Sequence, residues 1–120
     1  MQLTLHFSSE EMECNCGCGE VGMWFPAIEM LEKARVQAGI PFRINSAKRC
    51  EDHNAEVGGV SSSAHVGGFA FDIAVNNNSK NRYVVLKALM DAGFNRIGIA
   101  KTFIHVDASL SHPKNVIWMY

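Results

Sequence analysis

The stretch from Ser63 to Asp72 constrains this chain more than any other segment. It reads Ser-Ala-His-Val-Gly-Gly-Phe-Ala-Phe-Asp, so a short, mostly small-residue loop separates the imidazole of His65 from the carboxylate of Asp72. A second imidazole, His105, lies in the β-like run Phe103–Asp107. Two histidines and one aspartate are a suitable ligand set for a catalytic zinc ion that keeps one position for water. The chemistry predicted is hydrolysis of a polar bond by a metal-activated water.

Alternation of side chains separates a metal face from a core face in both segments. Residues 69–75 read as a strand, in which successive side chains point to opposite faces. The large apolar residues of this strand share the core face: Phe69, Phe71 and Ile73. Asp72 lies on the other face among small residues, and in the second segment His105 and Asp107 share the face opposite to the aliphatic residues. A buried carboxylate is costly without a partner, and a cation on that face would supply one.

Several segments, in matching order, resemble the motifs of the M15 peptidases, which include D-alanyl-D-alanine carboxypeptidases and related phage endolysins. The resemblance covers most of the chain, and the segments that carry it are Asn45–Asn54 with the following Val57–Gly59, Ser63–Asp72, and Phe103–Asp107. The first is similar to the family's Ser-Gly-Tyr-Arg region, and the other two to its first zinc motif and the segment of its third zinc ligand.

The resemblance implies a zinc peptidase with named site residues. It makes His65, Asp72 and His105 the zinc ligands. It makes Arg49 the cation that holds the substrate carboxylate or the developing oxyanion, and it assigns Ser63 to substrate binding. The implied substrate is a peptide bond in the peptidoglycan stem, with a D-alanine-containing bond as the first expectation. The implied fold is that of the hedgehog signalling domain and the DD-peptidases.

Some positions depart from the family pattern. Many relatives have an acidic general base three residues before the last histidine, and here that residue is Thr102. Asp107 is the nearest acidic candidate for the base, and it could instead orient a ligand imidazole. Lys48 and Ala47 replace the tyrosine and the glycine that precede the family's arginine. These departures bear on the base and on substrate specificity more than on the metal site.

Two other functions remain open at this point. One is an endopeptidase that cuts between L-alanine and D-glutamate, as some M15 endolysins do. The other is a non-catalytic, zinc-dependent binding module of the same fold, because the hedgehog domain resembles the peptidases. Thr102 in the position of the usual acid favours this second alternative.

The cysteines are unusually placed. Cys14, Cys16 and Cys18 alternate in a glycine-containing run, and Cys50 directly follows Arg49. Four thiolates could hold a structural metal, although the one-residue gaps are tighter than the usual two. A single disulfide to Cys50, in an oxidising location, is the competing interpretation. Free thiols are the third, and the spacing favours free thiols or one disulfide over a metal. Either crosslink would steady the loop that carries Arg49.

The periodicity predicts a single α+β domain over residues 1–120, with helices packed on one mainly antiparallel sheet. Strands are expected at Phe42–Asn45, 69–75, Arg96–Ala100, Phe103–Ala108 and Val116–Met119. Helices are expected after a Ser8 or Ser9 cap, from Trp24 to a stop at Gly39 and Pro41, over Cys50–Glu56, and from an N-cap at Ser79 to a stop at Gly93. Val60–Gly68 is expected to be a loop.

Side chains outside the motifs receive plainer interpretations. Trp24 and Trp118 are expected to anchor the core. Asn54 is expected to be structural, capping the short helix or bracing the Arg49 loop. His6 and His112 belong to no recognisable constellation.

Composition sets outer limits on the function. The formal charge is −1 and the acidic and basic residues are interspersed, which gives no footprint for a nucleic-acid partner. No run is apolar enough to span a membrane, and the start has no secretory signal pattern. A monomer is expected, because one small domain needs no partner for its core. A phage- or prophage-encoded product that reaches the bacterial cell wall, or a bacterial protein delivered by another route, would fit.

Overall fold

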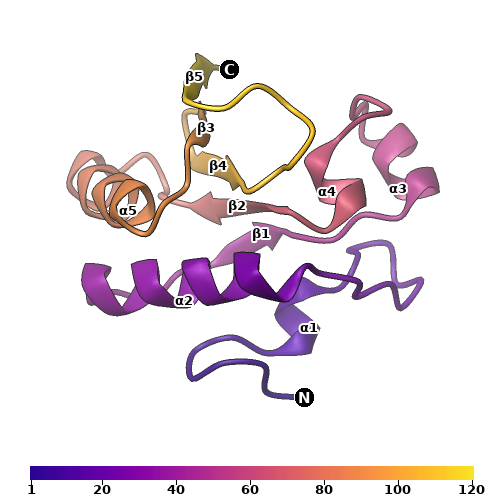
Figure 1. Ribbon diagram of the computed structural model, residues 1–120, viewed down its shortest axis with the longest axis horizontal. Helices are drawn as coiled ribbons and strands as arrows, with labels where there is room; N and C mark the ends of the chain where they lie inside the picture. The colour runs from indigo at the N-terminus through magenta and orange to yellow at the C-terminus, as the bar shows by residue number, and fades with distance from the viewer.

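A five-stranded sheet organises the chain (Figure 1). This computed structural model describes residues 1–120, and the strands lie side by side in the order β1 (Ile44–Ser46), β2 (Ala70–Ala74), β4 (Phe103–Asp107), β3 (Arg96–Ile99) and β5 (Val116–Met119). Every neighbouring pair is antiparallel except β3 and β5, which run parallel. The expected α+β class with a mainly antiparallel sheet is therefore confirmed.

Five helices accompany the sheet: α1 (Ser9–Met12), α2 (Phe25–Ala38), α3 (Glu51–Glu56), α4 (Ala64–Gly67) and α5 (Ser79–Asp91). The long helices α2 and α5 pack against each other, and their apolar sides share one core with the sheet. The short helices α3 and α4 lie beside each other near one end of the sheet, and α5 lies near the other (Figure 1).

The core lies on the sheet face that alternation predicted, except that Phe69 precedes β2, is half-buried and lies outside the core cluster. Phe71, Ile73, Ile104 and Val106 are fully buried in the cluster that also contains the apolar sides of α2 and α5. Each such side chain stabilises the fold by about 1.5–3 kcal/mol. Trp24 is the exception to the expected core, because it is 37% exposed at the start of α2. The prediction that Trp24 anchors the core was wrong.

Local capping explains where most helices begin and end. Ser8 and Glu11 form a capping box around α1. Gly39 ends α2 in the left-handed conformation (φ 69°), and its N–H donates to the Arg35 carbonyl. The N-cap of α5 is Asn78 and not Ser79, because the Asn78 side chain accepts the Asn81 N–H.

One segment expected to be a loop contains a helix. The four residues of α4 begin after Ser63, whose hydroxyl accepts the His65 N–H at 3.2 Å. Gly68 then ends the helix with φ 81°. This single turn positions His65 for the site.

None of the five helices combines the length and the apolar character that a membrane span requires.

Candidate metal centre and active site

His65, Asp72 and His105 converge on the sheet face opposite the core. One ligand atom from each lies within 4.8 Å of the others. Asp72 and His105 are directly paired residues of the antiparallel strands β2 and β4, and such paired side chains lie close together on the same face. His65 reaches them from α4, with its Nε2 atom 3.3 Å from Asp72 Oδ1. The sheet register therefore positions two of the three candidate ligands, and a helix turn positions the third.

The ring of His65 is held by its other nitrogen. His65 Nδ1 lies 2.7 Å from the carbonyl oxygen of Ala47, and a carbonyl can only accept, so Nδ1 carries the proton. Nε2 is consequently the ring nitrogen that faces Asp72 and is available to ligate a metal. Metal-ligating histidines in proteins are oriented in this way, by a hydrogen bond from the nitrogen that faces away from the metal.

The ring of His105 is held in the same manner. Its Nε2 atom lies 2.7 Å from Asp107 Oδ2, and its Nδ1 atom lies 2.9 Å from Asp72 Oδ1. Both rings are thus oriented by an oxygen on the outer side and face the Asp72 carboxylate on the inner side. Two imidazole nitrogens and one carboxylate oxygen are donors that zinc accepts, so the residues present fit a zinc ion with an open position.

The electrostatics of the cluster favour a cation. Burial raises the pKa of Asp72, but hydrogen bonds from His105 and His65 hold it well below its usual range. Burial lowers the pKa of His105, but Asp107 and Asp72 raise it above its ordinary value. The two carboxylates thus stabilise positive charge between them, and a divalent ion can replace the ring proton that they favour.

Arg49 stands next to this cluster. Its Nη2 atom lies 3.7 Å from Asp72 Oδ2, and its Nη1 atom donates to Asn54 Oδ1 at 3.1 Å. Asn54 is buried and its Nδ2 atom donates to the Val60 carbonyl. Gly59 packs so closely on Asn54 that an added Cβ would lie 2.1 Å from Asn54 Oδ1. These contacts agree with the bracing role expected for Asn54.

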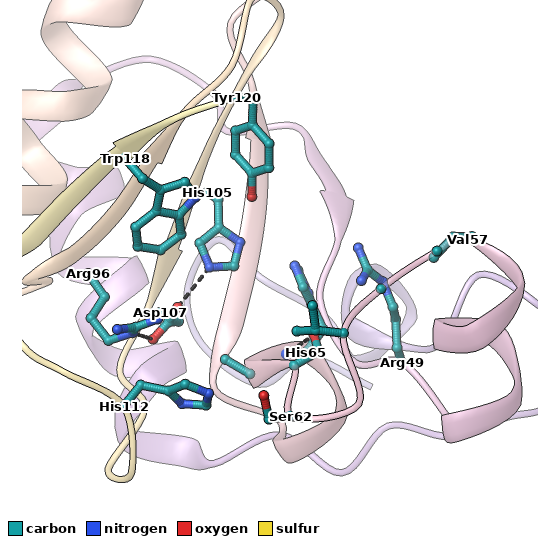
Figure 2. Close-up of a pocket in the computed structure, with 15 residues that line it drawn as sticks. Arg49, Val57, Ser62, His65, Arg96, His105, Asp107, His112, Trp118 and Tyr120 are labelled. Atoms are coloured by element: carbon teal, nitrogen blue, oxygen red, sulfur yellow. Dashed lines mark hydrogen bonds and ion pairs between the residues drawn. The ribbon is translucent and has the colours of Figure 1, made fainter.

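A pocket of about 450 Å³ is lined by His65, His105 and Arg49 (Figure 2). Asp72 lies beside both histidines but does not line the pocket itself. The volume of the pocket lies within the usual range for small-molecule sites. Figure 2 shows Trp118, Tyr120 and His105 on one side of the pocket, and His65 and Arg49 on the other.

A scan of protein families matches the description "Peptidase M15" over residues 5–107. The chain belongs to this family. The match contains all three candidate ligands and Arg49, and membership makes the chain a peptidase of a family that is in general zinc-dependent. No curated protein matches the chain.

In this M15 peptidase, four residues of the pocket were missed by the sequence interpretation: Arg96, His112, Trp118 and Tyr120. Trp118 was expected in the core, but it is half-buried, with its ring centroid 5.4 Å from that of His105. Gly98 makes room for it, because an added Cβ would lie 2.6 Å from Trp118 Nε1. The available signal was the alternation of Trp118, in β5, with Tyr120, directly after β5. That alternation predicts a shared position at the pocket only once the parallel pairing of β5 with β3 is known.

Asp107 is fully engaged by protein groups. Its Oδ1 atom accepts from Arg96 Nε at 2.7 Å and from the Ser109 N–H at 3.1 Å, while Oδ2 accepts from His105. Burial raises its pKa, but the bond from His105 and the nearby Arg96 lower it below the ordinary value. With 1% of its surface exposed, Asp107 has the surroundings of an orienting group, which is the second of the two roles left open.

The remaining residues singled out in the sequence lie at the edge of the pocket or away from it. Ser63 lines the pocket while its hydroxyl caps α4. Thr102 lies at the exposed turn between β3 and β4 and is absent from the pocket lining. Lys48 donates to the Val66 carbonyl and so ties α4 to the Arg49 loop. The four cysteines are free thiols and form a second cluster, defined by Cys14, Cys16, Cys18 and Cys50.

Proposed function

We propose that this M15 peptidase uses zinc to hydrolyse a peptide bond in the peptidoglycan stem, with a D-alanine-containing bond as its first substrate. The observation that carries the proposal is the convergence of His65, Asp72 and His105. In each histidine, the ring nitrogen that faces away from the cluster is already hydrogen-bonded to an oxygen atom. A phage- or prophage-encoded enzyme acting on the bacterial cell wall is the setting that best fits this activity.

In the proposed mechanism, His65, Asp72 and His105 would hold the zinc. When bound, the metal supplies Lewis-acid activation of a water and polarisation of the scissile carbonyl. Ala47 and Asp107 keep the two imidazoles in the tautomers and orientations that ligation needs.

Arg49 binds the substrate end. A guanidinium recognises a carboxylate through paired, charge-assisted hydrogen bonds. Arg49 is braced by Asn54 on one Nη atom, which leaves the other side of the fork directed at Asp72 and the pocket. A terminal carboxylate, or an oxyanion formed at the attacked carbonyl, would be bound there.

Two residues that line the pocket, Asp107 and His112, could accept the proton of the attacking water. Asp107 is occupied by three donors. His112 lines the same pocket, and its Nδ1 atom lies 2.6 Å from Ser109 Oγ, which fixes the ring and leaves Nε2 without a protein partner. We therefore assign the proton acceptor to His112 in preference to Asp107.

Turnover of defined stem peptides tests the proposal. The zinc-loaded protein is incubated with purified peptidoglycan and with stem peptides, and the products are weighed by mass spectrometry. Release of D-alanine, abolished by a chelator and restored by zinc, is expected. Fragments split between L-alanine and D-glutamate would move the assignment to the endopeptidase alternative.

The second candidate function is a zinc-dependent binding module that does not cut its ligand. No exposed carboxylate lines the pocket. Asp107 is its only carboxylate and is buried, and the position where many relatives have an acid is Thr102, which does not line the pocket. A zinc-dependent module that binds wall peptides without cutting them would have this property. Zinc bound at the His65 site, with saturable peptide binding but no turnover on any stem peptide, would select the binding module and reject the peptidase mechanism.

A further inference from the structure

The cysteine cluster gathers thiols from two distant parts of the chain. Cys14 Sγ lies 3.4 Å from Cys16 Sγ and 3.8 Å from Cys50 Sγ, and the Cys16 and Cys50 sulfurs are 3.7 Å apart. All four sulfurs, Cys18 included, lie within 4.8 Å of one another. No two are bonded as a disulfide.

These separations match a tetrahedral metal site. Zinc–sulfur bonds are about 2.3 Å, so four thiolates at tetrahedral corners lie roughly 3.8 Å apart. A disulfide brings two sulfurs to about 2.05 Å and leaves the others unpaired. The observed spacing is therefore that of four ligands around a centre, and a single disulfide would use only half of them.

The backbone around the cluster is shaped to present sulfur atoms inward. Gly17 and Gly19 alternate with the cysteines and have φ values of 83° and 86°, a conformation that glycine adopts without strain. The Cys14 N–H donates to the Glu20 carbonyl at 2.8 Å and closes the loop. The one-residue gaps between the cysteines are thus compatible with convergence.

Backbone N–H groups also point at the sulfurs. The Cys50 N–H donates to Cys14 Sγ at 3.4 Å, and the His53 N–H donates to Cys50 Sγ at 3.3 Å. Groups that hydrogen-bond to metal ligands orient them and stabilise their charged form. Cys50 is in addition the N-cap of α3, so its position is fixed by a helix.

We propose that Cys14, Cys16, Cys18 and Cys50 bind one structural zinc ion, separate from the catalytic one. The loop around the cluster has no regular structure, and only Cys14 among its thiols is buried. The metal would therefore supply the crosslink that this segment otherwise lacks.

The position of Cys50 gives the second site a role. Cys50 directly follows Arg49, and the Arg49 N–H donates to the His65 carbonyl at 3.1 Å. A metal at the cysteine cluster would tie residues 14–18 to the loop that carries Arg49. The existence of the site does not depend on the proposed function, whereas this positioning effect on Arg49 rests on it.

Counting zinc per chain tests the site. Elemental analysis should give two zinc ions for the wild type, one for His105→Ala and one for the double variant Cys16→Ser/Cys18→Ser. X-ray absorption of His105→Ala should give only sulfur neighbours at about 2.3 Å. One zinc in the wild type, unchanged by the cysteine substitutions, would overturn the proposal, as would iron in place of zinc or a mass lower by two hydrogens.

A wild-type experiment covers the case in which the cysteine variant fails to fold. A mercurial reagent, which attacks thiolates, is added to the zinc-loaded protein with a chromophoric chelator present. One zinc per chain should be released as four thiols react. Titration of the thiols with no zinc released would reject the site even if no variant were soluble.

The two proposals fail in different ways. If the peptidase proposal fails, stem peptides survive but the mercurial still releases zinc. If the cysteine site fails, the mercurial releases none, whereas zinc bound by His65, Asp72 and His105 remains. If only the positioning effect fails, Cys16→Ser/Cys18→Ser loses one zinc and keeps the wild-type KM for stem peptides.

Discussion

The two clusters of candidate metal ligands are built on opposite kinds of support. In the His65, Asp72 and His105 cluster, Asp72 and His105 stand on paired strands over a fully buried core and His65 stands on α4. Each of its histidine rings is fixed by a further hydrogen bond. The cysteine cluster stands on an irregular, glycine-containing segment, and only Cys50 belongs to the edge of a helix. The first is positioned by the fold, and the second would gain its order from the metal that we propose it binds.

This difference indicates what each cluster contributes. Sites carried on strands and helices hold their geometry more closely than sites on loops. The cluster of His65, Asp72 and His105, called the strand-borne cluster below, therefore has the precision that catalysis would require. The cysteine cluster, called the loop-borne cluster below, has the character of a crosslink. A metal bound there would supply the free energy that folds the surrounding segment.

The largest effect is expected from His105→Ala. Removal of one ligand from the strand-borne cluster removes the metal's contribution, which is worth several kcal/mol, so kcat/KM should fall at least about 10³-fold. Thermal unfolding should change far less, because the core face of β4 is untouched. The measurements are stem-peptide turnover and calorimetry. Activity within tenfold of the wild type would remove His105 from the ligand set.

Gly68→Ala is expected to give the next largest effect. Gly68 lies where the N-terminal segment crosses the His65 helix: the Trp24 N–H donates to the Gly68 carbonyl, and an added Cβ would lie 2.2 Å from the Gly22 carbonyl oxygen. Its φ of 81° adds strain. Together these should cost roughly 2–5 kcal/mol of unfolding free energy.

Gly39→Ala is the matched control for this substitution. Gly39 has a similar φ of 69°, but nothing lies within 4 Å of its added Cβ. It should cost only about 1–2 kcal/mol, since the backbone strain is its only penalty. Denaturant unfolding of both variants measures the difference. Equal losses would mean that the crossing at Gly68 is not tightly packed and that the two regions are less coupled than the structure indicates.

Arg49→Ala should come third. Loss of hydrogen bonds to a charged substrate group costs about 1.5–3 kcal/mol, or roughly 10–100-fold in kcat/KM. Arg49→Lys should recover only part, because an ammonium lacks the paired fork. Zinc content should stay at the wild-type value in both variants. An unchanged kcat/KM on a substrate with a free terminal carboxylate would show that Arg49 does not bind it.

The sequence predicted the strand-borne cluster much better than the loop-borne one. Alternation in the two strand segments was enough to separate Asp72 and His105 from the core, because that pattern depends only on neighbouring residues. The C-terminal end of α2 followed from Gly39 in the same local way. His65 was singled out by its short, small-residue spacing to Asp72, the family resemblance assigned all three residues as ligands, and the family match covers their segments.

Other parts depended on contacts that local patterns do not contain. The four-residue α4 is too short to show a helical period, and it depends on the Ser63 cap and on the bond from Arg49 to His65. Trp118 enters the pocket only because β5 pairs in parallel with β3. The cysteine cluster needs Cys50, which is 36 residues from Cys14.

Asp107→Asn is expected to give the smallest effect, and it tests how the strand-borne cluster is held. If Asp107 only orients His105, the amide oxygen can still accept the Nε2–H, so zinc affinity should fall by about tenfold or somewhat more. With zinc in excess, kcat should remain within a few-fold of the wild type.

His112→Gln is the comparison variant. It should bind zinc normally and lose kcat by about 10²-fold, the usual contribution of a general base. Zinc affinity is measured by competition with a chromophoric chelator. Circular dichroism checks that the Asp107→Asn variant stays folded when Arg96 loses its charged partner. The reverse pattern, with kcat lost in Asp107→Asn and kept in His112→Gln, would return the base to Asp107. The tight set of bonds around that carboxylate would then have to open during turnover.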